Sequence, residues 1–343
     1  MEQHRLSKGP LLGPDGNLLE AGYANSLVKD YDRNAIKAKK SRIKEWDYYY
    51  IGNKRFGIAL TIADNSYMAM ASVSVLNFEG IPSCLTKSPM QWFTFGKLGL
   101  PSSSEKGETR IEGKGYTLSF VVEGNKRRIL AEMADFGKKG EFFHCDIVLT
   151  PTFEDTMVIA TPFKKKGHFY YNQKMNCLKA IGYARVGEKT YDLGEDTYAV
   201  LDWGRGVWTY KNTWYWASMS ATLDGKPFGF NLGYGFGDTS KASENMVFFE
   251  GKAYKLTDVR MDIPISPSGS DDFMSPWKFR SSSGDIDMDF VPVYRRHSDT
   301  NALLIRSNQN QVFGLYSGTI RVEGKEISFR DLPGFAEKVF NRW

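Results

Sequence analysis

The sequence has few of the residues on which secreted and metal-binding proteins depend. Only 3 cysteines occur in 343 residues, Cys84, Cys145 and Cys177, and they are far apart. Their spacing matches neither a zinc site nor a redox motif, so we expect free thiols in a reducing compartment. The 4 histidines are equally dispersed. We therefore predict no bound metal, and nothing in the sequence implies a cofactor.

Long hydrophobic runs are also missing. No apolar stretch approaches the roughly 18 residues that span a bilayer, so we expect no integral membrane segment. The first twenty residues contain neither an apolar leader core nor a small-residue cleavage site, which favours a cytoplasmic protein.

The excess of positive charge is small, because 45 Lys and Arg stand against 40 Asp and Glu, a net charge of +5. We expect no nucleic-acid partner, since the basic residues are scattered and no binding motif accompanies them. Two local basic stretches, 35–44 and 164–166, are interpreted as solvated surface. A phosphate-binding role for the first stretch is the alternative.

What the sequence does have is alternation with a period of two. Residues 67–75, 116–122 and 142–149 place apolar side chains on one face and polar or small ones on the other. Such segments, bounded by frequent Gly, Asn and Asp turns, predict antiparallel strands. Strands of this kind over the whole length predict an all-β fold of sandwiches or barrels.

Helical patterns are scarce. The clearest is DLPGFAEKVFNRW at 331–343, where Phe335, Val339 and Trp343 recur every four residues after a proline; it predicts a short C-terminal helix. A weaker helix is predicted over 35–44. The strand pattern is interrupted by Pro, Lys and Gly at about 161–174. We therefore predict two domains, 1–165 and 166–343.

Tryptophan is concentrated in LDWGRGVWTYKNTWYWASMS. Four of the 8 Trp of the chain lie in this segment, together with Tyr210: Trp203, Trp208, Trp214 and Trp216. Read as a strand, the segment places Trp214 and Trp216 on one face. Indole rings around a barrel mouth suit a greasy or ring-shaped ligand, since each supplies a large apolar wall and one hydrogen-bond donor. A solid Trp-rich core is the structural alternative.

Asp202, directly before Trp203, is the first candidate catalytic residue, because Asp is unusual in strands. Walled by indoles, its carboxyl would be desolvated and its pKa would rise, as a general acid requires. Alternatively, Asp202 pairs with Arg205, which would lower its pKa. Asp47, between Trp46 and Tyr48, presents the same two possibilities.

A glycine-rich strand, GFNLGYGFG at 229–237, has one bulky face and one nearly bare face, which lets a ligand or a backbone come close. No helix follows directly, so we do not interpret it as a phosphate-binding loop. Polar and aromatic residues in and after this strand, and in FYYNQK, are further candidates. They are Tyr171 as a possible proton donor, and Asn172, Asn231, Tyr234, Asp238 and Glu244 as ligand-binding residues.

Motifs along nearly the whole chain resemble the bacterial family named domain of unknown function 2804. They are RIKEWDYYY, MVIATPF, FYYNQK, LDWGRGVW, GFNLGYGFGDTS, SPWKF and GFAEKVFNRW. The resemblance implies a lipocalin-like (calycin) fold: two antiparallel β-barrels or half-barrels. The order of LDWG, an aromatic strand and an Asp-Gly turn is also similar to carotenoid hydratase and tocopherol cyclase relatives. On that pattern Asp202, Trp203 and Gly204 align with the acid-bearing strand, although no His follows Asp202 and Arg205 follows the glycine.

The leading functional hypothesis is an enzyme that uses acid chemistry on a hydrophobic, isoprenoid-like small molecule, as a hydratase, cyclase or isomerase. Asp202 would donate the proton, the four indoles would stabilise positive charge, and Tyr171 and Asn231 would orient a polar group or water. A non-catalytic binding protein for an apolar metabolite is the first alternative. A carbohydrate-active protein is the second, since Trp and Tyr platforms with Asp and Asn also suit sugar rings.

Overall fold

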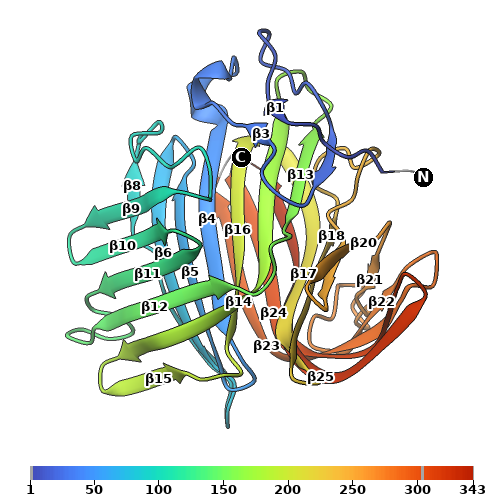
Figure 1. The fold of residues 1–343 in the computed structure, drawn as a ribbon. Coiled ribbons are helices and arrows are strands. Elements are labelled where there is room, and N and C mark those ends of the chain that lie inside the picture. The colour runs from blue at the N-terminus through green and yellow to red at the C-terminus, as the bar shows by residue number, and fades with distance from the viewer. Residues whose placement is uncertain (1–2, 303–304, 343) are drawn as a thin grey trace.

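Antiparallel strands account for almost all of the regular structure, as the alternation predicted. The computed structural model describes residues 3–302 and 305–342. Two large sheets, each curled into a half-barrel, dominate the molecule and lie back to back (Figure 1). The all-β prediction is confirmed. None of the helices in the described residues has the length and apolar character needed to cross a bilayer.

The first sheet has 14 strands, with the order β7-β6-β5-β4-β16-β14-β12-β11-β10-β9 along its main path. Its members are β2 (Gly22–Ala24), β4 (Ile43–Gly52), β5 (Phe56–Asp64), β6 (Met68–Asn77), β7 (Ser83–Lys87), β8 (Met90–Trp92), β9 (Gly107–Gly113), β10 (Tyr116–Glu123), β11 (Lys126–Met133), β12 (Phe143–Pro151), β13 (Met157–Pro162), β14 (Phe169–Val186), β15 (Lys189–Leu193) and β16 (Tyr198–Val207). We call the body that it forms the first half-barrel.

The second sheet has 9 strands in the order β20-β19-β18-β17-β25-β24-β23-β22-β21 and forms the second half-barrel. Its members are β17 (Lys211–Leu223), β18 (Lys226–Tyr234), β19 (Met246–Phe249), β20 (Lys252–Lys255), β21 (Arg260–Asp262), β22 (Trp277–Arg280), β23 (Ile286–Ala302), β24 (Ile305–Val322) and β25 (Lys325–Arg342). Short elements complete the chain: the strand pair β1 (Gly9–Pro10) and β3 (Lys29–Asp30), and the 3₁₀ turns η1 (Arg33–Ala35) and η2 (Lys40–Arg42).

Turn residues in the sequence mark several hairpin ends. Both central residues have positive φ at 224–225, 250–251 and 323–324, which is the backbone of the tight turn whose twist matches paired strands. Each of these pairs consists of an acidic residue followed by glycine. The hairpins of the second half-barrel are therefore largely specified by local sequence.

The predicted C-terminal helix is wrong. Residues 331–342 belong to strand β25, which pairs with β17 on one side and β24 on the other; Trp343 lies outside the described residues. A central strand satisfies its backbone groups through both neighbours, and this tertiary pairing overrides a local helical pattern. The helix predicted over 35–44 is reduced to the single turn η2, after which β4 begins at Ile43.

The chain passes from the first sheet to the second between Val207 and Lys211, whereas the sequence placed the division near residue 165. The interruption at 163–168 is the turn between β13 and β14, two paired strands of the first sheet. Strand β16 with its LDWG motif also belongs to the first sheet, where it lies between β14 and β4.

Buried side chains form three layers. One apolar cluster fills the inside of the first half-barrel and another fills the inside of the second. Between them, the outer faces of β4, β14 and β16 pack against β17, β18, β24 and β25 through two aromatic clusters. We call this third region the middle layer.

Candidate functional site

A row of polar side chains crosses the middle layer on each sheet. In the first sheet, strand register places Lys174 beside Asp202, and Asp202 beside Tyr48. Residues directly opposite each other on neighbouring strands point to the same face. The facing row in the second sheet crosses five strands: Gly233, Trp216, Glu337, Gln311 and Arg296. The two rows meet where Lys174 Nζ lies 3.9 Å from the centroid of the Trp216 ring.

Asp202 is held as an ion-paired carboxylate. Its Oδ1 lies 3.0 Å from Lys174 Nζ and accepts a hydrogen bond of 2.6 Å from the side-chain amide of Asn172. The Asp202 side chain remains 12% exposed, so solvent reaches this group. The amide oxygen of Asn172 is buried and has no hydrogen-bond partner among the described residues, which leaves one acceptor beside Asp202 for a bound molecule.

Two further carboxyl groups lie in the same layer. Glu337 accepts hydrogen bonds from Trp214 Nε1 at 2.8 Å and from Gln311 Nε2 at 3.2 Å. Burial raises the pKa of Glu337 to about 7, with the charge of Asp202 adding to the effect. Burial also raises the pKa of Glu244, although Lys174 opposes this shift. The middle layer therefore holds carboxyl groups in two different environments, one ion-paired and two desolvated.

Glycines make room for these side chains. A Cβ on Gly233 would lie 2.6 Å from Oε1 of Glu244, so the bare strand face noted in the sequence accommodates a carboxyl group. A Cβ on Gly204 would lie 1.9 Å from the Trp46 ring, so the glycine of LDWG lets that indole lie directly over the backbone. Both glycines are close-approach positions rather than turns.

Aromatic rings surround the carboxyl groups. Trp208 is in edge contact with Trp46 and Phe236, at centroid distances of 5.0 and 4.9 Å. Trp214 also packs on Phe236, at 5.2 Å. Trp216 is fixed by a 2.7 Å hydrogen bond from its Nε1 to Asn231. The rings form a wall that excludes water from most of the layer and strengthens electrostatic interactions inside it.

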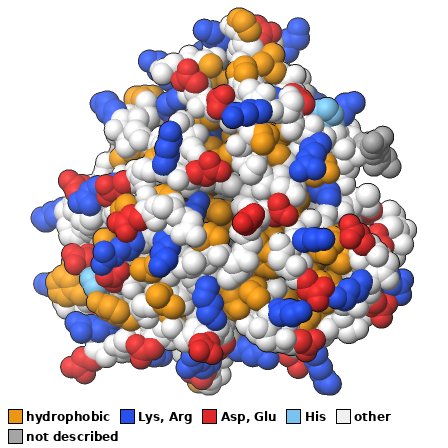
Figure 2. Space-filling model, viewed as in Figure 1, with side chains coloured by type: hydrophobic (Ala, Val, Ile, Leu, Met, Phe, Trp, Pro, Cys, Tyr) orange, Lys and Arg blue, Asp and Glu red, His pale blue; other side chains and the backbone are white. Residues whose placement is uncertain are grey.

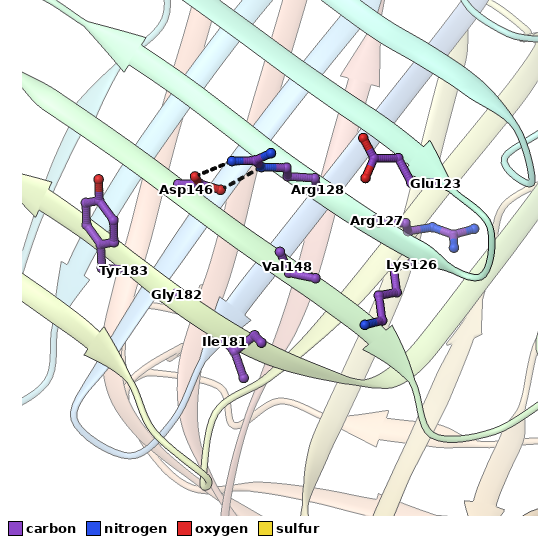
Figure 3. Close-up of a pocket in the computed structure, with 9 residues that line it drawn as sticks. All are labelled: Glu123, Lys126, Arg127, Arg128, Asp146, Val148, Ile181, Gly182 and Tyr183. Carbon is purple, nitrogen blue, oxygen red and sulfur yellow. Dashed lines mark hydrogen bonds and ion pairs between the residues drawn. The ribbon is translucent and has the colours of Figure 1, made fainter.

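The middle layer is closed in this structure. A cavity between Tyr50, Val200, Ser218 and Phe335 measures about 10 Å³, which is room for about one water molecule. A larger depression of about 460 Å³ lies elsewhere, on the outer face of β10, β11, β12 and β14 (Figure 3). Its Arg128 and Asp146 are paired with each other and partly exposed. We therefore place the candidate site at the buried carboxyl groups and not at the larger depression.

Seven of the residues singled out in the sequence come together in the middle layer or its aromatic wall. They are Asn172, Asp202, Trp208, Trp214, Trp216, Asn231 and Glu244. Sequence reasoning missed Lys174 and Glu337. Lys174 was detectable, since it follows Asn172 by two residues and so shares its strand face. Glu337 was not, because the sequence around it predicted a helix.

Four candidates point the other way, into the first half-barrel. Trp203 belongs to the apolar cluster there, and the Arg205 guanidinium lies 2.9 Å from the Asp47 carboxylate. Arg205 therefore pairs with Asp47 and not with Asp202. Tyr171 donates a hydrogen bond of 3.1 Å to the backbone oxygen of Lys29. Alternation along β14 and β16 separates these residues from Asp202.

The last three candidates lie apart from both groups. Tyr210 is exposed, and Tyr234 stacks on Tyr215 at 4.6 Å against the core of the second half-barrel. Asp238 accepts a hydrogen bond from the backbone of Ser240 and caps a turn. Within residues 3–302 and 305–342, no three His, Cys, Asp or Glu side chains are arranged to hold a metal ion.

The chain belongs to the family described as domain of unknown function (DUF2804), whose model matches residues 2–343. This confirms the family that the sequence motifs suggested. No curated protein matches the sequence. The activity must therefore be argued from the site.

Solved structures resemble the chain over nearly its whole length. A structure of AttH from Nitrosomonas europaea has a TM-score of 0.55 at 12% identity, covering 92% of this chain and 98% of that one. Kievitone hydratase from Nectria haematococca gives 0.49 at 13% identity, covering 97% and 98%. CghA gives 0.43 at 10% identity, covering 98% and 97%. The similarity to the AttH structure concerns the fold alone.

Proposed function

We propose that this DUF2804 protein is an enzyme that hydrates, cyclises or isomerises a hydrophobic small molecule by proton transfer in the middle layer. The observation that carries the proposal is the contrast between Glu337, whose pKa burial raises to about 7, and Asp202, which is paired with Lys174. Carboxyl groups in environments that favour opposite protonation states are how enzymes divide acid and base roles. A cytoplasmic location is part of the proposal.

Glu337 is the proton donor in this proposal, a role that the sequence had suggested for Asp202. For a hydration, the Glu337 carboxyl protonates one carbon of a double bond, and positive charge develops on the other. The faces of Trp214 and Trp216 stabilise that charge. Water adds to the cation and loses a proton to the Asp202 carboxylate, and solvent then carries the proton back to Glu337. In a cyclisation or isomerisation, Asp202 removes a proton from carbon instead.

Substrate entry requires the aromatic wall to open. Trp46 and Trp214 are only partly buried and connect the two aromatic clusters of the layer, and Asp202 already reaches solvent. We propose that these two rings separate to admit the substrate. A closed, aromatic layer suits an apolar molecule better than a sugar, which would call for an open groove with paired carboxylates.

A binding protein for an apolar metabolite is the second candidate, since the same aromatic wall would serve it without proton transfer. The two are separated by first identifying the ligand. The full chain would be purified from its native host and examined by native mass spectrometry for a retained small molecule. The identified compound would then be incubated with the protein, and products would be followed by chromatography.

Glu337→Gln and Asp202→Asn would each keep ligand affinity within a few-fold and reduce turnover about 100-fold or more, the usual contribution of a positioned acid or base. Asp146→Asn, on the outer face of the first half-barrel, is the matched control and would leave turnover unchanged. Full activity of Glu337→Gln would reject the assigned acid. Tight binding of the compound by the native protein without any turnover would establish the binding protein instead.

A further inference from the structure

Exposed aromatic side chains are concentrated at one end of the first half-barrel. Trp92 and Phe93 are each 65% exposed, and Phe95 is 43% exposed. Trp92 is the last residue of strand β8, and the two phenylalanines follow it. Soluble proteins rarely present large neighbouring rings to water without a use for them.

These rings are held outward by the backbone. Thr94, between the two phenylalanines, is buried and its hydroxyl donates a hydrogen bond of 2.8 Å to Asp64. Phe93 and Phe95 have φ of 57° and 47°, a left-handed conformation that bulky residues seldom adopt. The Phe93 amide also donates to the backbone oxygen of Tyr67 at 2.7 Å. Backbone strain of this kind persists where the surrounding structure enforces it and often marks a functional segment.

Basic residues lie next to the rings. The Arg33 guanidinium, which is ion-paired with Glu45, packs so closely on Gly96 that a Cβ there would lie 2.5 Å from it. This contact joins the aromatic segment to the turn η1. The Lys37 side chain in turn contacts Gly16. The neighbouring Asn17 accepts a hydrogen bond of 2.7 Å from the amide of Gly167, beside the lysines of 164–166. We call these three adjoining segments, 33–42, 90–97 and 163–167, the aromatic-basic end.

Charge in the aromatic-basic end is predominantly positive, although Asp15 and Asp32 border its segments and Arg33 is paired with Glu45. Its segments contain nine basic residues and no Asp or Glu: Arg33, Lys37, Lys39, Lys40, Arg42, Lys97, Lys164, Lys165 and Lys166. Since the whole chain has a net charge of +5, the remainder has 36 basic and 40 acidic residues, or −4. The small net charge of the whole chain is therefore the sum of a basic end and a slightly acidic remainder. At the top of the molecule, Figure 2 shows basic and hydrophobic side chains together with some acidic ones.

We propose that the aromatic-basic end docks on the surface of an anionic lipid bilayer. Aromatic side chains insert at the headgroup level, and lysines are attracted by the negative surface potential of anionic lipids. A single-stranded nucleic acid would also engage lysines and rings together, and the experiment therefore compares vesicles with heparin, a polyanion without bases. The proposal is independent of the chemistry in the middle layer and would stand if that chemistry were disproved.

Vesicle sedimentation tests the proposal with the full chain. We expect binding to vesicles of 70% phosphatidylcholine and 30% phosphatidylglycerol, weak binding to pure phosphatidylcholine, and release by salt. Lys39→Glu/Lys40→Glu should weaken binding about 25-fold or more, since each lysine near an anionic surface contributes a factor of about five. Phe93→Ser/Phe95→Ser should also weaken vesicle binding at least tenfold, while leaving any retention on heparin unchanged.

Matched controls carry the same kinds of substitution elsewhere on the surface. Lys126→Glu/Lys139→Glu removes two exposed lysines, and Ile181→Ser/Tyr183→Ser removes two exposed side chains on β14; both should bind like the native chain. Circular dichroism would verify that every variant is folded. The proposal is overturned if the native chain does not sediment with anionic vesicles, or if the aromatic variant binds as well as its control. Equal affinity for heparin and for vesicles would also overturn it.

Discussion

The two half-barrels are built from the same kind of curled antiparallel sheet, but their interiors differ. The first encloses the ion pair of Asp47 and Arg205, a second buried arginine, Arg127, and a loop that covers them. The backbone oxygens of Pro101 and Ser104 in that loop accept hydrogen bonds from the two guanidinium groups. The second encloses an apolar cluster of rings, methionines and aliphatic side chains. In the part of the chain that the structure describes, buried side chains pack inside both half-barrels.

This difference indicates where to look for chemistry in such a fold. A sheet curled into a half-barrel suggests a site inside the curl, yet Glu244 and Glu337, whose pKa burial raises, lie where the sheets pack back to back. The first interior uses its charges to hold a loop, and the second uses only packing. The middle layer combines ionisable groups with aromatic walls and access to solvent at Asp202, so it is the region suited to proton transfer.

The largest effect should come from breaking the ion pair inside the first half-barrel. Asp47→Ala leaves the fully buried Arg205 guanidinium without its charged partner, and we expect a loss of about 3–5 kcal/mol in the free energy of unfolding. Urea unfolding followed by fluorescence would measure it. The exposed pair of Asp262 and Arg260 is the control, where Asp262→Ala should cost at most about 1 kcal/mol.

A double substitution that makes the first interior apolar, like the second, tests the same ion pair. Asp47→Leu/Arg205→Met replaces the pair by apolar side chains, and such replacements are often neutral or stabilising by about 1–4 kcal/mol. If the double variant is about as stable as the native chain, the destabilisation by Asp47→Ala arises from the unpaired charge of Arg205. A loss as large as that of Asp47→Ala would instead show that the hydrogen bonds to the covering loop are essential.

The next effect is a pH dependence that belongs to the middle layer. Because burial raises the pKa of Glu337 from 4.5 to about 7, its contribution to stability is complete below pH 4.5 and is lost as the pH rises to about 7. The native chain should lose on the order of 3 kcal/mol relative to Glu337→Gln over this interval. Urea unfolding of both proteins at several pH values would measure it. A constant difference would contradict the raised pKa.

A smaller effect is expected from crowding the middle layer. Gly204→Ala places a methyl group against the Trp46 indole, and we expect about 1–3 kcal/mol of destabilisation with a changed near-ultraviolet dichroism spectrum. Gly194→Ala meets only the Asp196 carboxylate, at 3.3 Å, and should stay within about 0.5 kcal/mol of the native chain. Equal values for the two variants would show that Trp46 is free to move.

The smallest effect should be found on the outer face of the first half-barrel. Arg128 and Asp146 form a two-pronged pair with distances of 3.0 and 2.7 Å (Figure 3), but both side chains are solvated. Asp146→Asn should cost about 1 kcal/mol or less, and added salt should shrink the difference further. A cost approaching that of Asp47→Ala would erase the distinction between the buried and exposed pairs.

Much of the fold could be predicted from the sequence, because alternation and turn residues act locally. The error at β25 has a physical cause. Phe335 and Val339 share a face with Glu337 and Asn341, and all four are largely buried. Polar residues on the buried face broke the period of two and left an apolar spacing of four, which is typical of a helix. The sequence pattern failed where the middle layer buries its polar groups.

The candidate site was predicted only in part, for a related reason. Grouping residues by closeness in the sequence joined Asp202 to Trp203 and Arg205, although successive strand residues point to opposite faces. The true neighbours of Asp202 come from β14 next to it and from β17 and β25 across the layer. Packing of the second sheet on the first brings Glu337 near Lys174, and no local pattern encodes such packing.

The position of β25 between β17 and β24 also determines when the protein can become competent during translation. Every strand of the first half-barrel has been synthesised once Val207 is made, whereas the second sheet lacks a middle strand until residues 325–342 are made. Before β25 is made, a nascent chain therefore contains every strand of the first sheet, while β17 and β24 of the second sheet lack their shared neighbour and have unpaired edges. Because Glu337 lies in β25, a translation product that stops before this strand lacks the proposed acid.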